Sequence, residues 1–154
     1  IMKKYLVLAA AALTVAATPA FANETRLEAR GGVIWDGSSE AIAGVAAGYD
    51  FDLGDKAFAG LEVSGDKILE SGTRVSFGFG GRVGAKVGDA GKLYAAAAYQ
   101  TKPCGGCENS VSVGAGYQHA FGDKFYGKVE YRHFFVDSGV SDPDAVVAGL
   151  GVKF

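Results

Sequence analysis

The chain has 154 residues, of which 49% are hydrophobic, 12% are aromatic and 24 are glycines, and its formal net charge is −2. This length suits a single domain, and the slightly acidic balance leaves no basic surface for nucleic acid, so nucleic-acid binding is excluded. Abundant glycine can indicate disorder, but valine, tyrosine and phenylalanine at alternating positions favour β-strands instead.

The first 22 residues have the layout of a secretory signal peptide. Lysines at positions 3 and 4 precede an apolar run from Leu6 to about Ala17, and the small-x-small triplet Ala20–Ala22 ends the segment. The run is shorter than the roughly 20 residues that a helix needs to cross a bilayer. We expect cleavage after Ala22, which leaves residues 23–154 as one domain and changes the net charge from −2 to −4 because two lysines are lost. We interpret Ile1, before Met2, as a gene-calling artefact.

Beyond this segment, apolar residues alternate with small or charged residues in eight successive segments. The clearest is TRVSFGFGGRVGAKVG, which starts at Thr73 and has valine or phenylalanine at most of its odd-numbered positions. Successive strand side chains point to opposite faces, so each segment predicts a strand with one apolar face. In chain order the segments are Leu27–Trp35, Val45–Leu53, Ala57–Val63, Val75–Val87, Leu93–Tyr99, Val111–Tyr117, Phe125–Phe135 and Val146–Phe154.

The connections between these segments alternate in length. Tight polar turns are expected at Leu53–Lys56, Gly88–Lys92 and Gly122–Lys124. Longer segments are expected at Asp36–Glu40, Gly65–Gly72, Lys102–Asn109 and Asp137–Pro143. Short turns at one rim and longer loops at the other predict an up-and-down meander.

The face opposite the apolar one is composed mainly of glycine, alanine and serine with charges of both signs. A narrow eight-stranded barrel has room inside for only such side chains, so the apolar face then points outward into lipid. The fold class is therefore all-β, an eight-stranded antiparallel up-and-down transmembrane β-barrel. A lipocalin-like secreted barrel is the rival, and it would need large apolar residues on the inward face.

The inward charges have two interpretations, a packed network of ion pairs or the lining of a pore. Since both signs are present and eight strands leave no aqueous channel, we favour the packed network. Its expected members are Arg26, Glu28, Arg30, Asp50, Asp52, Glu62, Arg74, Arg82, Lys86, Lys128, Glu130 and Arg132.

The signal peptide, the alternating segments and the ending VEYRHFFVDSGVSDPDAVVAGLGVKF resemble the small outer-membrane β-barrel family of Gram-negative bacteria, which includes opacity-type surface proteins and porin-like barrels. In that family the assembly machinery reads the last strand. Gly149, Val152 and Phe154 match this assembly signal, whereas Val147 stands where a polar residue is usual. The pair Tyr131-Arg132 is also similar to the family.

The resemblance implies a monomeric outer-membrane surface protein with a structural or interaction role, in envelope integrity or adhesion. We expect periplasmic termini and extracellular longer loops. The expected partners are outer-membrane lipid, the barrel-assembly machinery and an unidentified extracellular ligand. We expect no cofactor and no catalytic or metal-binding residues. A lipid A deacylase and a small-solute channel remain the alternatives.

Two groups of polar residues are candidates for chemistry. Some eight-stranded outer-membrane barrels are lipid A deacylases with a histidine near the end of the seventh strand, and His133 resembles it. The serine that those enzymes carry two positions later is Phe135 here. A calcium site is a second option, because carboxylates are calcium ligands and three occur close together, although solvated loop charges explain them as well. These carboxylates are Asp137, Asp142 and Asp144.

The only two cysteines, Cys104 and Cys107, form a CxxC in the third of the longer loops. A thioredoxin-like redox site needs a helix N-terminus, and a zinc site needs four ligands, whereas this motif lies between strands. Export passes through an oxidising periplasm. We favour a Cys104–Cys107 disulfide that fastens the loop, with free thiols or a bound metal as the alternatives.

Overall fold

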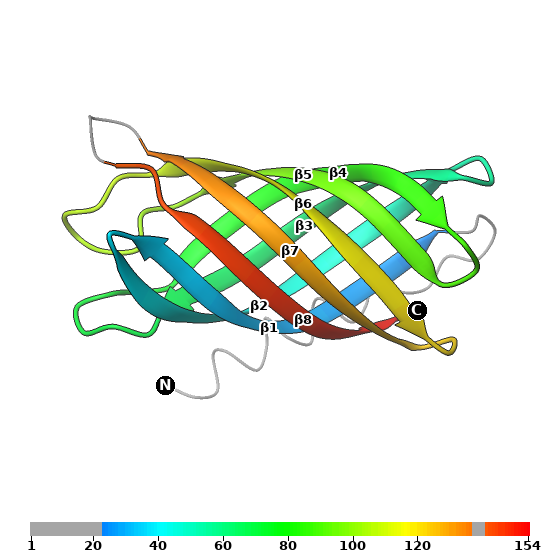
Figure 1. Cartoon of the computed structure of the whole chain (residues 1–154), viewed down its shortest axis with the longest axis horizontal. Helices are drawn as coiled ribbons and strands as arrows, with labels where there is room; N and C mark the ends of the chain where they lie inside the picture. Colours follow the sequence, from blue (N-terminus) through cyan, green and yellow to red (C-terminus); the bar gives the residue numbers. More distant parts are fainter. Residues whose placement is uncertain (1–22, 137–140) are drawn as a thin grey trace.

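The computed structural model describes residues 23–136 and 141–154, so the predicted signal peptide lies outside the described residues. Eight antiparallel strands, in chain order, form a closed barrel in which β1 also pairs with β8 (Figure 1). The predicted fold class is confirmed. The strands are β1 (Glu24–Asp36), β2 (Ser38–Leu53), β3 (Ala57–Ile68), β4 (Ser76–Val87), β5 (Gly91–Gln100), β6 (Ser110–Phe121), β7 (Phe125–Val136) and β8 (Asp144–Lys153).

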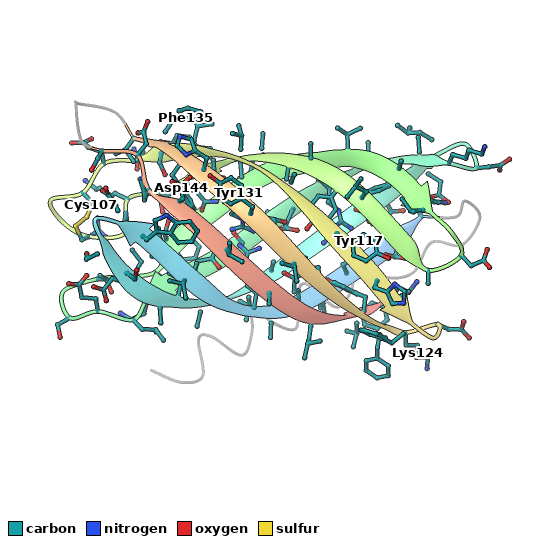
Figure 2. All side chains as sticks on the ribbon, in the orientation of Figure 1. Cys107, Tyr117, Lys124, Tyr131, Phe135 and Asp144 are labelled. Atoms are coloured by element: carbon teal, nitrogen blue, oxygen red, sulfur yellow. A yellow bond between two sulfur atoms is a disulfide. The ribbon has the colours of Figure 1, made fainter. Side chains whose placement is uncertain are left out.

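The alternation of the sequence becomes the two faces of the barrel wall. On β8, Val146 is 40% exposed on the outside, whereas its neighbour Val147 is 1% exposed in the lumen. Leucine, valine and phenylalanine side chains cover the outside, and Figure 2 draws them around the whole barrel. A surface this apolar suits hydrocarbon, in which a closed barrel also satisfies every backbone group of its wall. Within the described ranges, no helix is long and apolar enough to cross a membrane.

The two ends of the barrel differ, and we call them the turn end and the loop end (right and left in Figure 1). The turn end holds the C-terminus and the three predicted tight turns, where Gly54, Gly88 and Gly122 have positive φ angles of 82°, 64° and 73°. The loop end holds the β1–β2, β3–β4, β5–β6 and β7–β8 connections.

The longer segment predicted at Asp36–Glu40 is wrong. β1 and β2 stay paired up to Asp36 and Ser38, and Gly37 alone reverses the chain with φ 76°. A left-handed residue of this kind is cheap only for glycine, which allows the tight turn. The alternation could not reveal this turn because polar residues continue through it.

The β3–β4 connection also differs from the prediction. β3 continues to Ile68, so Asp66 lies in the strand and not in the predicted loop Gly65–Gly72. The last backbone hydrogen bond to β2 is from Leu69 N to the Ala41 carbonyl, over 2.8 Å. Beyond it, the Oγ1 atom of Thr73 lies 2.6 Å from the Ile68 carbonyl oxygen and 2.8 Å from that of Glu70. β4 begins only at Ser76, which leaves Arg74 in the connection.

Candidate functional site

The lumen of the barrel has two chemically different parts. In the middle and toward the turn end, charged side chains fill it, and we call this part the charged plug. Toward the loop end, apolar side chains surround a cavity, and we call this part the apolar cup. The plug consists of Arg26, Glu28, Arg30, Asp50, Glu62, Asp66, Arg82, Lys92, Lys128, Glu130 and Arg132. The cup is formed by Ile34, Ile42, Ile68, Phe134, Ala145 and Val147.

Asp50 is the centre of the half of the plug that is nearer the turn end, and it is only 1% exposed. Arg82 from β4 donates to both of its carboxylate oxygens, over 3.1 and 2.5 Å. Arg26 Nε lies 3.3 Å and Lys92 Nζ 3.1 Å from the same carboxylate. A bidentate arginine pair is the strongest common form of ionic hydrogen bond. Three strands besides β2 are thus tied to one carboxylate.

Glu62 has the same role in the half of the plug that is nearer the loop end. Arg26 Nη1 and Arg30 Nη1 donate to its two oxygens over 3.1 and 2.9 Å. Arg30 also grips Asp66 with two donors, at 2.8 and 2.5 Å. Lys128 Nζ lies 3.9 Å away from Glu62. β1 and β3 are therefore joined across the lumen although they are not neighbours in the sheet.

Two further carboxylates of the plug, Glu28 and Glu130, accept hydrogen bonds from tyrosine hydroxyls. Glu130 accepts from Tyr94 over 2.6 Å and from Arg132, and Glu28 accepts from Tyr126 over 3.0 Å. Lys128 lies between these carboxylates, 2.9 Å from Glu28 and 3.4 Å from Glu130. Buried charges are tolerated when each contacts an opposite charge, as these three residues do.

Inward-facing glycines make the space for these long side chains. A Cβ atom on Gly60 would lie 2.2 Å from Asp50 Oδ1, and one on Gly149 would lie 2.8 Å from the Glu28 carboxyl carbon. Both distances are too short for a real contact, so a side chain at either position would displace the ion pairs. Gly149, predicted as part of an assembly signal, thus also has a packing role.

The side chains of the plug are closely packed. A hollow of about 30 Å³ remains among Arg30, Glu62, Arg82, Glu130 and Arg132. A water molecule needs about 10–15 Å³ of such space, so the hollow holds about two waters and no larger solute. At the turn end, Arg82 and Lys92 also lie over the ring of Phe58, which is fully buried. These are cation–π contacts, and they hold the three side chains together inside the barrel.

Most members of the predicted network lie in the plug, and the exceptions are at strand ends. Asp52 and Lys86 form a separate pair over 2.7 Å at the turn end, where their side chains are 20% and 29% exposed. Arg74 is not in the lumen, and its Nη2 lies 3.5 Å from the carbonyl oxygen of Cys104. The reason is that β4 starts two residues after it. All other predicted members are in the plug.

The sequence prediction missed other participants, Asp66, Lys92, Tyr94, Tyr126, Glu24 and Lys153. Glu24 bridges Lys92 and Lys153 at 3.0 and 3.3 Å near the turn end. The alternation itself would have found several of them, since Glu24 shares the inward face with Arg26, and Lys92 with Tyr94. They were missed because they lie at strand ends or are not charged.

The apolar cup surrounds a cavity of about 300 Å³ at the loop end. Four large apolar side chains line it, those of Ile34, Ile42, Ile68 and Phe134, and Ala145 and Val147 pack behind them. Its floor is the top of the plug, where Asp66, Arg132 and Gln100 also line the cavity. Val147, the residue that departs from the family pattern, is thus part of this cluster.

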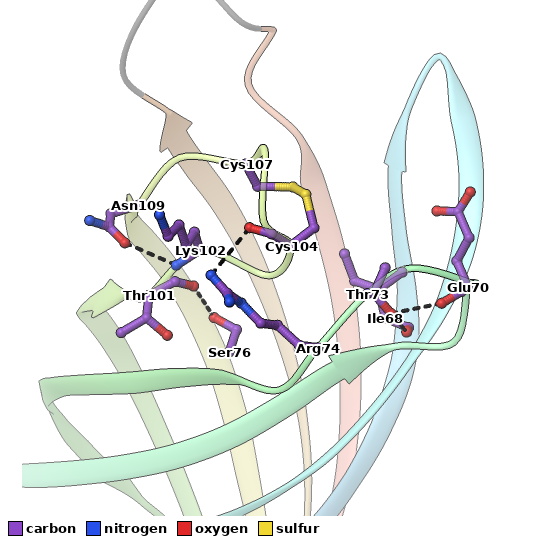
Figure 3. The surroundings of a disulfide bond; sticks show 10 residues. All are labelled: Ile68, Glu70, Thr73, Arg74, Ser76, Thr101, Lys102, Cys104, Cys107 and Asn109. Carbon is purple, nitrogen blue, oxygen red and sulfur yellow. Dashed lines mark hydrogen bonds between the residues drawn. A yellow bond between two sulfur atoms is a disulfide. The ribbon is translucent and has the colours of Figure 1, made fainter.

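The β5–β6 loop forms one wall of the cup and contains a disulfide between Cys104 and Cys107 (Figure 3). The loop is bonded to the β3–β4 connection, because Arg74 N donates to the Pro103 carbonyl over 2.7 Å. Lys102 N donates to Asn109 Oδ1 over 2.9 Å across its base. Cys107 N also donates to the Cys104 carbonyl over 3.3 Å. The wall is therefore held by a covalent link and by backbone hydrogen bonds.

His133 lies on the outside of the barrel near the loop end. Its Nδ1 is 2.7 Å from Asp144 Oδ1, which also accepts the Tyr131 hydroxyl. The ring of Phe135 packs edge-to-face on the imidazole, with centroids 4.7 Å apart. Asp142 Oδ2 is 4.0 Å from Nε2.

The alternative of a calcium site gains no support from the part of the chain that the structure describes. No cluster of three potential metal ligands occurs there. Asp137, one of the three carboxylates of that alternative, lies outside the described residues. What the geometry does provide is an imidazole oriented by a carboxylate on the lipid-facing surface.

No protein-family model matches the chain, and no curated protein matches it either. Solved structures do. The N-terminal β-barrel domain of Pseudomonas aeruginosa OprF matches with a TM-score of 0.59 and 17% identity, over 85% of this chain and 97% of that one. Neisserial surface protein A matches with a TM-score of 0.58 and 15% identity, over 86% and 97% of the two chains.

A de novo designed transmembrane β-barrel is similar to the same degree, with a TM-score of 0.58 and 17% identity over 85% of this chain and 95% of that one. Since a designed protein has no natural ancestor in common with this chain, the likeness at such identities reflects the architecture. The predicted resemblance to small outer-membrane barrels is confirmed at the level of the fold, and these neighbours support the predicted location in the outer membrane.

Proposed function

We propose that this protein is a non-conducting surface barrel of the outer membrane, in which the charged plug closes the lumen and the loop end serves interaction. The termini then face the periplasm and the loops face outward. The single observation that carries the proposal is the plug, in which one carboxylate, that of Asp50, contacts three cations: Arg26, Arg82 and Lys92.

The plug supports a structural role rather than a transport role for the lumen. Moving ions through it would require separating buried pairs, and leaving one charge without its partner costs about 3–5 kcal/mol. The closed sheet supports a monomer, because β1 pairs with β8 and no strand edge is left to recruit a second chain. The outward apolar side chains support lipid as the immediate partner, and the last strand, with Val152 and Phe154, suits recognition by the assembly machinery.

Conductance in planar lipid bilayers tests the closed lumen. We expect no steady openings from the purified protein. The double variant Asp50→Ser/Arg82→Ser, which removes a bidentate pair from the plug, should conduct. The matched control Asp52→Ser/Lys86→Ser removes the pair at the turn end and should stay closed. Heat-modifiable migration on a gel verifies that each variant is folded. Steady openings of the unmodified protein would overturn the proposal.

Location and orientation have their own test, which uses the cysteines. We expect the protein in the outer-membrane fraction, with heat-modifiable migration. A membrane-impermeant maleimide should label intact cells only after a reductant has opened the Cys104–Cys107 link. Labelling without reductant contradicts the disulfide, and labelling only after cell lysis contradicts the outward orientation of the β5–β6 loop.

A lipid A deacylase is the second candidate, because the His133 imidazole is oriented by Asp144 on the lipid-facing side, as a general base requires. The only hydroxyl bonded to this pair within residues 23–136 and 141–154 is that of Tyr131. We favour the non-enzymatic role because Phe135 stands at the position of the serine of such enzymes. Mass spectrometry of lipid A from cells with and without the gene separates the two, and loss of an acyl chain that depends on His133 would establish the enzyme.

A further inference from the structure

We propose that the apolar cup is a binding site for a compact, neutral, apolar molecule of about two fused rings. This inference deepens the proposed surface role, on which it rests only for the side from which a ligand arrives. The observation behind it is that the lumen changes from charged to apolar within one barrel, and that the apolar part is the one that is not filled.

The cup is a convergence of side chains and not a chance exposure. Ile34, Ile42, Ile68 and Phe134 come from four different strands and turn inward at the same height, where Ile42 and Ile68 are paired directly across β2 and β3. If their role were packing alone, they would fill the space, since protein interiors are packed as densely as organic crystals. They line a cavity instead.

The volume of the cavity sets the size of the ligand. It measures about 300 Å³, which is at the lower end of the range for small-molecule sites, about 300–1,000 Å³. An apolar cavity of about 150 Å³ in another protein stays free of water and binds benzene. Twice that volume fits a two-ring compound.

The charges at the cavity favour a neutral ligand. Asp66 is held by two donors of Arg30, and Arg132 donates to Glu130, so both are already paired within the plug. A ligand anion would meet Asp66 and also Glu108 on the loop, and a ligand cation would meet Arg132. Uncharged polar groups of Gln100 and Ser110 also line the cavity, and they suit a single hydroxyl or carbonyl group on the ligand.

The chain offers a direct reporter of this cavity. Apart from Ile1, its only isoleucines are Ile34, Ile42 and Ile68, and all three line the cup. In the full chain in lipid nanodiscs with labelled isoleucine methyl groups, titration with 2-naphthol should therefore shift these three signals in a saturable way. The methyl groups of Leu61, Leu93 and Leu150, on the lipid-facing surface, report partitioning into lipid and should change without saturation.

Two further arms test the chemistry and the place. The anion 2-naphthalenesulfonate and the cation 2-naphthylmethylammonium should bind at least about ten times more weakly than 2-naphthol. The variant Ser110→Phe fills the cavity and should abolish the saturable isoleucine shifts, whereas Ser39→Phe, which adds the same ring on the exposed start of β2, should retain them.

Three results would overturn the proposal: isoleucine shifts that never saturate, binding of either ion within tenfold of that of 2-naphthol or tighter, and unchanged binding by Ser110→Phe. Heat-modifiable migration identifies a variant that has not folded, and the second filling variant Val136→Trp then takes its place. None of these results depends on conductance or on orientation in the cell, so failure of the cup and failure of the proposed surface role are distinguishable.

Discussion

The charged plug and the apolar cup share four strands, β1, β2, β3 and β7, and the same inward alternation, and yet their side chains meet opposite requirements. In the plug, every carboxylate contacts at least one cation, and glycines such as Gly60 let the side chains fill the space. In the cup, aliphatic side chains contact one another and leave a cavity. The difference teaches that the barrel wall does not decide what the lumen does, because the inward residues at each height do.

Asp50→Asn is the substitution with the largest expected effect on this comparison. It leaves Arg26, Arg82 and Lys92 without their shared negative charge in a buried site, which should lower the free energy of unfolding by about 3–5 kcal/mol. Urea unfolding in detergent micelles, followed by the fluorescence of the single tryptophan, Trp35, measures it.

Asp52→Asn is the matched control, two residues further along the same face of β2. Its partner Lys86 is partly exposed, so water can solvate the remaining ammonium, and the loss should stay below about 1 kcal/mol. Equal losses for the two variants would show that the plug is not the special region described above.

Val147→Ala probes the cup side of the comparison and should cost about 2 kcal/mol. The side chain is 1% exposed, and removing two carbons leaves a void behind the residues that line the cavity. Val146→Ala, the adjacent residue on the outside, should cost less than about 1 kcal/mol because lipid chains can occupy the space. The same unfolding measurement applies, and a larger loss for Val146→Ala would contradict the assignment of faces.

Cys104→Ala/Cys107→Ala tests the wall of the cup rather than the stability of the barrel. A link between residues three apart closes a short loop, for which chain entropy gives at most about 2 kcal/mol. The affinity for 2-naphthol should fall by a larger factor than the equilibrium constant for folding, because the loop forms a wall of the cup. Unfolding and titration of the double variant measure both, and an unchanged titration would mean that the disulfide does not hold that wall.

Much of this molecule could be predicted because strand alternation is a local property of the chain. The number of strands, the apolar outside and most plug members follow from which residues stand at alternate positions. The predictions fail where the alternating segment and the hydrogen-bonded ladder end at different residues. Arg74 keeps the parity of β4 without belonging to it, and Asp66 lies in β3 although its neighbourhood reads as a loop.

The sequence by itself determined the strands, their two faces and the balance of charge inside, since each of these depends on residues close together in the chain. Only the tertiary structure decided which inward residues meet. Strands in a closed barrel are tilted and staggered, so the height of each side chain in the lumen depends on the register of all the pairs around it. That register brings Arg82 to Asp50, Arg30 to Glu62, and three distant isoleucines to one cavity. No local pattern contains it, because it is fixed only when β8 closes on β1.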